Sequence, residues 1–142
     1  AAPIHRPLLQ VESSTFIPER FYGYRRLSGF TIAEKEKALV DSLFMPEKAG
    51  GLDEVAYSLA NAWSRIDANK FRDYLIRFRN KSLVSRVGYL LEKLRLTESA
   101  GKLWRHKSET YVKLNPAENK NGGLDGRWNI IVNHDITEEE IT

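Results

Sequence analysis

Lysine and arginine side chains recur at helical spacing in the middle third of this chain, and they are its best candidates for binding chemistry. Arg72 and Arg79 lie seven residues apart on one flank of an apolar stripe, and Arg86 and Lys93 share the face of the next helix opposite its leucines. Seven residues are close to two helical turns, so each pair is expected on one side of its helix. An exposed cationic helix face suits the phosphate backbone of a nucleic acid or an acidic protein surface.

The charge of the chain is concentrated in the same region. Between Arg65 and Lys107 there are twelve Lys and Arg residues against four Asp and Glu, whereas the other residues carry ten against fifteen. This asymmetry favours an anionic partner, although basic side chains also solvate ordinary helices and extend along core stripes with their charged ends in water. The candidate binding residues are Arg72, Arg77, Arg79, Lys81, Arg86, Lys93 and Arg95.

The sequence contains few patterns that are typical of catalysis or metal binding. There are no cysteines, which excludes disulfides, thiolate catalysis and cysteine-type zinc sites. The three histidines, His5, His106 and His134, are isolated in the sequence, and the chain has neither a phosphate-binding glycine loop nor a nucleophile-elbow motif. We therefore expect no catalytic residue, no metal, no cofactor and no enzymatic activity.

Asp41 and Gly88 are unusual for the helices in which they are expected. Asp41 interrupts an apolar face between Val40 and Leu43, which predicts either a buried carboxylate of perturbed pKa or a helix-edge residue bonded to the backbone or to an Arg. Glycine in the middle of a helix costs about 1 kcal/mol relative to alanine. We expect Gly88 to permit close packing against a neighbouring helix or the C-terminal hairpin.

The N-terminal part that precedes these helices is rich in β-branched and aromatic residues. It predicts short strands in segments 8–17, 19–26 and 28–33. Thr31 and Glu34 have the spacing of a capping box, so the first helix is expected to begin near Ile32 and to stop before Pro46.

Apolar stripes predict three further helices and a short fifth one. The second helix begins after the Gly50-Gly51 turn, and we expect Asp67 to cap the third helix and Ser82 to cap the fourth. The fifth runs from Thr97 to about His106.

After the helices, alternation of apolar and polar residues replaces helical spacing. Segments 109–115 and 126–133 predict two strands of a hairpin joined by a turn-rich connector. The fold class is therefore α+β, with N-terminal short strands, a central bundle of four to five helices and a C-terminal β-hairpin in a single domain, 1–142. Two helices joined by the short turn 80–82 and followed by a hairpin also match the outline of a winged helix-turn-helix, which many small α+β domains share.

Four segments together resemble the AbiEi-type antitoxins of abortive-infection systems, a family also described as transcriptional regulators of viral defence systems. Their order and spacing match the family, and the similarity covers roughly Phe16 to His134. Arg95 stands where a glycine is expected to end the helix in this family. The segments are EKEKALVDSL (34–43), PEKAGGLDEV (46–55), SRVGYLLEKL (85–94) and RWNIIVN (127–133).

The resemblance implies an antitoxin that pairs an N-terminal winged-helix DNA-binding domain with a larger C-terminal domain. The partner gene of such antitoxins encodes a nucleotidyltransferase-like toxin, which the antitoxin counteracts in the type IV arrangement without needing a stable complex. The winged helix represses the operon, and the C-terminal domain supplies antitoxicity. This chain resembles the C-terminal domain. Because it lacks an initiator methionine and a preceding winged helix, we expect a piece of a longer protein.

Two functions follow as expectations. The first is a cytoplasmic, non-enzymatic antitoxin domain whose partner is the cognate toxin and which assists regulation of its operon. The second is a stand-alone transcriptional regulator that binds DNA or RNA through the winged-helix-like basic segment. No membrane partner is expected, because no apolar run approaches the roughly 18 residues that a membrane span needs.

Overall fold

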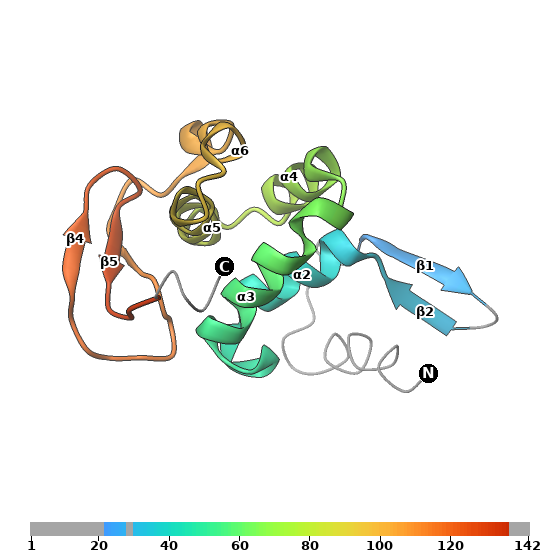
Figure 1. Cartoon of the computed structure of the whole chain (residues 1–142), viewed down its shortest axis with the longest axis horizontal. Coiled ribbons are helices and arrows are strands. Elements are labelled where there is room, and N and C mark those ends of the chain that lie inside the picture. The colour runs from blue at the N-terminus through green and yellow to red at the C-terminus, as the bar shows by residue number, and fades with distance from the viewer. Residues whose placement is uncertain (1–21, 28–29, 137–142) are drawn as a thin grey trace.

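Helices occupy the centre of the molecule, and a small β-sheet lies at each end (Figure 1). The computed structural model describes residues 22–27 and 30–136, and the strand predicted in segment 8–17 lies outside them. The α+β class is confirmed. None of the helices in these two ranges is long and apolar enough to cross a membrane.

Five α-helices and three short 3-10 helices follow one another between the two sheets. The N-terminal sheet pairs β1 with β2 in antiparallel fashion. The strands are β1 (Tyr24–Leu27), β2 (Phe30–Ala33), β3 (Val112–Lys113), β4 (Gly123–Asp125) and β5 (Ile130–Val132). The helices are α2 (Lys35–Phe44), η3 (Pro46–Ala49), α3 (Leu52–Ala62), η4 (Trp63–Arg65), α4 (Ala68–Arg77), α5 (Lys81–Lys93), α6 (Thr97–Gly101) and η5 (Trp104–His106).

The first helix begins later than its capping-box pattern predicts. Thr31 and Ile32 belong to β2 and pair with β1, so α2 begins only at Lys35. The backbone at Glu34, the residue before the helix, is extended, and its side chain makes no capping hydrogen bond. The residues that the local sequence assigns to the first helical turn are therefore part of strand β2, where they pair with β1. The helix ends at Phe44, before Pro46, as predicted.

One of the two predicted caps in the middle of the chain is confirmed. The Asp67 carboxylate accepts the backbone N–H groups of Asn69 (3.0 Å) and Lys70 (3.1 Å) at the start of α4. At the start of α5 the prediction of Ser82 is wrong. The Asn80 side chain accepts the N–H of Leu83 (2.9 Å), so the helix begins at Lys81.

The predicted hairpin of segments 109–115 and 126–133 is wrong in its pairing. β3 and β5 run parallel, with Val112 opposite Ile130, and the hairpin partner of β5 is β4, which lies within the expected connector. The sheet order is therefore β3-β5-β4. The connector is long enough to contribute a strand of its own. The chain then reverses through 126–129, where Asn129 takes the left-handed conformation that asparagine tolerates (φ 57°).

α5 is the centre of the hydrophobic core. It contacts α2, α4, α6, η5, β3 and β5, and every residue from Leu83 to Gly88 is buried. Elements therefore cover both its leucine side and the side that carries Ser85 and Arg86. Because a recognition helix must expose a continuous face to enter a DNA groove, the buried stretch of α5 is not accessible for that role.

Gly88 allows the indole of Trp128 to lie directly on the α5 backbone. A Cβ at Gly88 would meet the Cζ3 atom of Trp128 at 2.2 Å, closer than any normal contact. The Trp128 side chain is fully buried, and its Nε1 donates a hydrogen bond to Glu92 Oε1 (2.6 Å). The expectation that Gly88 permits close packing is confirmed, and its partner is the C-terminal sheet region.

Arg95 ends α5 in the left-handed conformation (φ 64°). The N–H of Arg95 donates to Glu92 O, and the N–H of Leu96 donates to Leu91 O, both at 2.9 Å. These two bonds form the Schellman motif, whose left-handed position favours glycine because a Cβ is strained there. The structure therefore explains why a glycine is expected at this position, and it shows that arginine is accommodated.

Candidate functional site

The seven candidate cations do not form one surface. Arg77, Arg79 and Lys81 are exposed around the turn between α4 and α5. Lys93 and Arg95 are exposed at the other end of α5, about 18 Å away at 1.5 Å per residue. The two remaining candidates belong to neither group. Arg72 lies on α4 and is half-buried, and Arg86 is buried in the core.

Arg86 was predicted on the exposed face of its helix, and the structure shows that this is wrong. The side chain is 5% exposed, and its guanidinium donates to three backbone oxygens: Leu114 O (2.8 Å), Leu43 O (3.2 Å) and Lys113 O (3.3 Å). Burial lowers the pKa of Arg86 to about 10, so the group stays protonated at neutral pH. Arg86 therefore joins the end of α2 and the end of β3 to α5.

Ser85 lies beside Arg86 and is also buried. Its hydroxyl accepts the backbone N–H of Ser108 (2.8 Å), which places the segment before β3 against α5. On the remainder of this face, Tyr89 is half-buried and Lys93 is exposed, with its Nζ 5.6 Å from the Tyr89 ring centroid. The predicted cationic face is thus reduced to the end of the helix.

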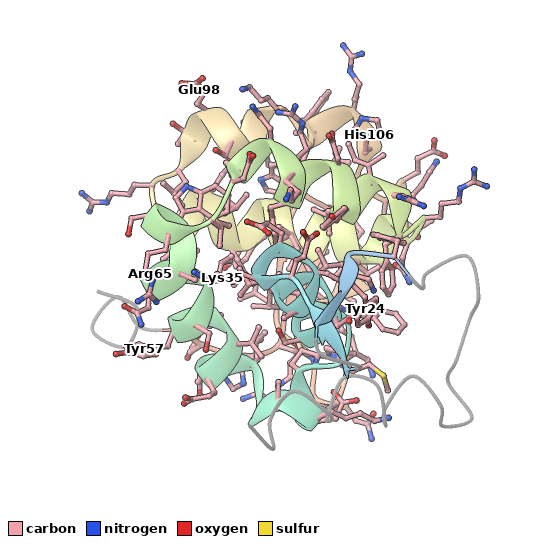
Figure 2. The ribbon with its side chains drawn as sticks, turned by 90° about the vertical axis from the view of Figure 1, so that its right-hand side faces the viewer. Tyr24, Lys35, Tyr57, Arg65, Glu98 and His106 are labelled. Carbon is pink, nitrogen blue, oxygen red and sulfur yellow. The ribbon has the colours of Figure 1, made fainter. Side chains whose placement is uncertain are left out.

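A basic groove opens between α4 and the α6–η5 segment, both of which pack against α5. Its volume is about 460 Å³, and among residues 22–27 and 30–136 no carboxylate lines it. In Figure 2, Glu98 and His106 mark the α6–η5 segment along the upper edge of the molecule. The lining residues are Arg72, Ile76, Gly101, Lys102, Arg105 and His106.

A small pocket shares Arg72 and Lys102 with the groove. Leu91 of α5 also lines this pocket. Of the predicted cations, only Arg72 lies in the groove. Lys102 and Arg105 belong to the basic segment recognised in the sequence, but they follow the short helix α6, where no long apolar stripe indicates which residues face the same way.

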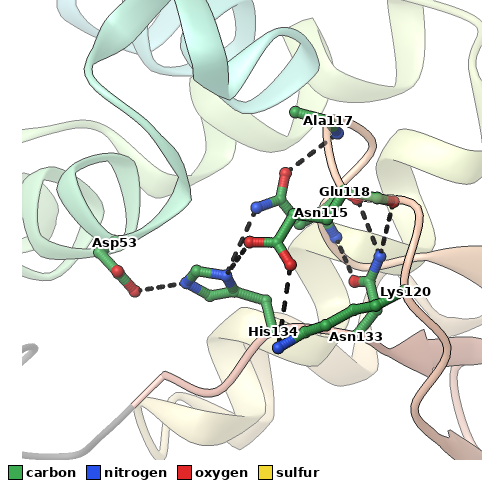
Figure 3. A network of polar contacts seen from close by, with 7 residues as sticks. All are labelled: Asp53, Asn115, Ala117, Glu118, Lys120, Asn133 and His134. Carbon is green, nitrogen blue, oxygen red and sulfur yellow. Dashed lines mark hydrogen bonds and ion pairs between the residues drawn. The ribbon is translucent and has the colours of Figure 1, made fainter.

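A second polar cluster joins the C-terminal segment to α3 (Figure 3). His134 Nε2 lies 2.8 Å from Asp53 Oδ1, and its Nδ1 lies 3.3 Å from Glu118 Oε1. Both ring nitrogens are therefore engaged. Among the residues that the structure describes, no group of three or more His, Cys, Asp or Glu side chains is placed to hold a metal ion.

The pKa of His134 is raised. Burial acts to lower it, but the hydrogen bonds and charges of Asp53 and Glu118 outweigh that effect. A raised folded-state pKa stabilises the fold below the unfolded value of about 6.5 and loses this contribution as pH rises through the folded value.

We expect the difference in unfolding free energy between the wild type and His134→Gln to shrink as pH rises from about 6 to about 8. Urea unfolding at several pH values measures it, with the other histidines common to both proteins. A difference that grows with pH would contradict the assigned ion pairs.

The pKa of Asp41 is perturbed, which is one of the two alternatives predicted for this residue. Its partners are a lysine and a tyrosine rather than the backbone or an arginine. Burial raises its pKa although Lys37 Nζ lies 2.6 Å from Oδ1 and opposes the change. The Tyr24 hydroxyl donates to Oδ2 (3.1 Å). Lys37 is itself buried, 4.7 Å above the Tyr22 ring centroid. These contacts hold β1 against α2, which is a structural role.

Comparison of the chain with protein-family models, with curated proteins and with solved structures returns no match. These comparisons therefore assign no family. The resemblance of four segments to AbiEi-type antitoxins stays a prediction from the sequence.

Proposed function

We propose that this chain is an antitoxin domain of a type IV toxin–antitoxin, or abortive-infection, system that counteracts a nucleotidyltransferase-like toxin. The four resembling segments support this proposal, because each one coincides with a structural element. They form α2, η3 with the start of α3, most of α5, and β5 with the three residues before it and the one after it.

The same four elements pack against one another. α2 contacts α3, η3 and α5, and α5 contacts β5. Gly88 of the third segment packs against Trp128 of the fourth so tightly that a Cβ at Gly88 would clash with the indole. Each of the four segments thus contributes residues to one hydrophobic core, among them Val40, Val55, Val87 and Trp128. This arrangement is the observation that carries the proposal.

In this proposal the domain acts in the cytoplasm as a binding module without catalysis, and it assists regulation of its operon. A second candidate function, a regulator that binds DNA or RNA, is favoured by the basic groove rather than by a recognition helix. The buried residues of α5 make the groove the better surface for that role.

Co-expression with the adjacent nucleotidyltransferase-like toxin tests the antitoxin proposal. We expect the wild-type chain to restore growth when the toxin is induced. A Trp128→Ala variant, which removes a fully buried core side chain, serves as the control for a loss of folding. Growth that stays arrested in the presence of soluble, folded wild-type chain would overturn the proposal.

A further inference from the structure

We propose that the groove between α4 and α6–η5 binds the phosphate backbone of a single-stranded nucleic acid. The inference rests on the groove itself and does not depend on the antitoxin proposal. Three permanent cations line it, namely Arg72, Lys102 and Arg105. Within the part of the chain that the structure describes, no carboxylate lines it to neutralise them.

The cations come from both walls of the groove. Arg72 belongs to α4, whereas Lys102 and Arg105 belong to the segment that runs from α6 into η5. A strand lying between the two walls would therefore meet positive charge on each side. A positively charged groove that follows the backbone is one of the features by which proteins bind single strands without reading their sequence.

The groove is also large enough to be a binding site. Its volume of about 460 Å³ lies in the range of roughly 300–1,000 Å³ that binding pockets occupy. The neighbouring pocket that shares Arg72 and Lys102 with it has only about 30 Å³, too small for a base. The groove therefore presents charge to a backbone rather than a recess for one particular base, which predicts binding that is insensitive to sequence.

Neighbouring acidic groups weaken this charge only slightly. Glu98 lies 3.9 Å from Lys102 Nζ, but the Glu98 side chain is 90% exposed. Exposed ion pairs of this kind contribute little and are screened by salt. Phosphate oxygens can therefore replace Glu98 as the partner of Lys102 at small cost.

Fluorescence polarisation of the whole chain with a labelled poly-uridine RNA of about twelve nucleotides tests the inference. We expect binding whose logarithmic affinity falls with the logarithm of salt concentration at a slope of about −2, since each single-strand phosphate contact contributes about −0.7. A deoxythymidine strand of equal length should bind similarly, and a duplex of equal length no more tightly.

Charge reversal localises the site. Arg72→Glu combined with Arg105→Glu is expected to lower affinity about tenfold or more, because it removes cations from both walls. The matched control is Lys48→Glu combined with Lys120→Glu, which changes the net charge equally at exposed positions outside the groove. Circular dichroism and urea unfolding establish that both variants fold.

Three outcomes would overturn the inference: no binding by the wild type at low salt, tighter binding of the duplex, or equal losses in the groove and control variants. All are measured on the purified chain without the toxin. Failure of the binding experiment would therefore not bear on the growth-rescue test of the antitoxin proposal. Failure of growth rescue would likewise not bear on strand binding.

Discussion

Replacing Arg86 with alanine is expected to lower the free energy of unfolding by about 3–5 kcal/mol, because it removes a buried, fully hydrogen-bonded charged group. The guanidinium is the donor to Leu43 O, Lys113 O and Leu114 O. Alanine would leave these oxygens without that donor and would open a cavity beside α5. Urea unfolding followed by circular dichroism measures the loss.

Arg79→Ala is the matched control for Arg86→Ala, since it removes an arginine that is exposed at the end of α4. Its effect is expected within about 0.5 kcal/mol, the usual range for surface substitutions. Arg86→Lys should recover only part of the stability, because an ammonium cannot reproduce the fork geometry of the guanidinium. Similar stabilities for Arg86→Ala and Arg79→Ala would show that Arg86 does not hold α2 and β3 together.

Replacing Trp128 with alanine is the second change with a large expected effect, a loss of about 3–5 kcal/mol. The indole is fully buried against Gly88, and its Nε1 hydrogen bond to Glu92 would also be lost. The same urea titration measures it. A loss below about 1 kcal/mol would mean that the C-terminal sheet does not depend on this contact.

The contact between Gly88 and Trp128 also predicts a reversal of sign. In the wild type, Gly88→Ala drives a methyl group into the indole, and overpacking of this kind costs about 1–3 kcal/mol. In a Trp128→Ala background the space is free, so alanine should stabilise by its helix propensity, about 1 kcal/mol. Equal effects in both backgrounds would show that positions 88 and 128 are not energetically coupled.

Much of the helical layout could be predicted from apolar spacing. Asp67 caps α4 as its position predicts, because capping is a local interaction between one side chain and the next turn. The start of α2 could not be predicted in this way. Residues up to Ala33 pair with β1, and strand pairing depends on a segment that local helix signals do not include.

The placement of Arg86 marks the limit of reasoning from one helix at a time. The leucines of α5 identify one buried side, and helical geometry then places Arg86 opposite them. The sequence does not show that β3 and the segment before it cover that opposite side too. Gly88 and Ser85, two small residues in mid-helix, are the signal of close packing that could have indicated it.

The candidate groove was accessible to sequence analysis only as a basic region. The charge count identified the segment from Arg65 to Lys107, which contains all three groove cations. Which cations converge depends on how α4 and α6 pack on α5, and that is a property of the tertiary structure. Arg72 was therefore found as a candidate, whereas Lys102 and Arg105 were not.

Growth rescue is the most direct test of the central claim that this chain is an antitoxin domain. Colonies are counted on medium that induces a nucleotidyltransferase-like toxin of the kind that the proposal assigns to this chain, with the wild-type chain, its Trp128→Ala variant or an empty vector. We predict colony numbers near those of uninduced cells for the wild type alone. Numbers equal to the empty vector, from a chain shown to be soluble and folded, would contradict the account.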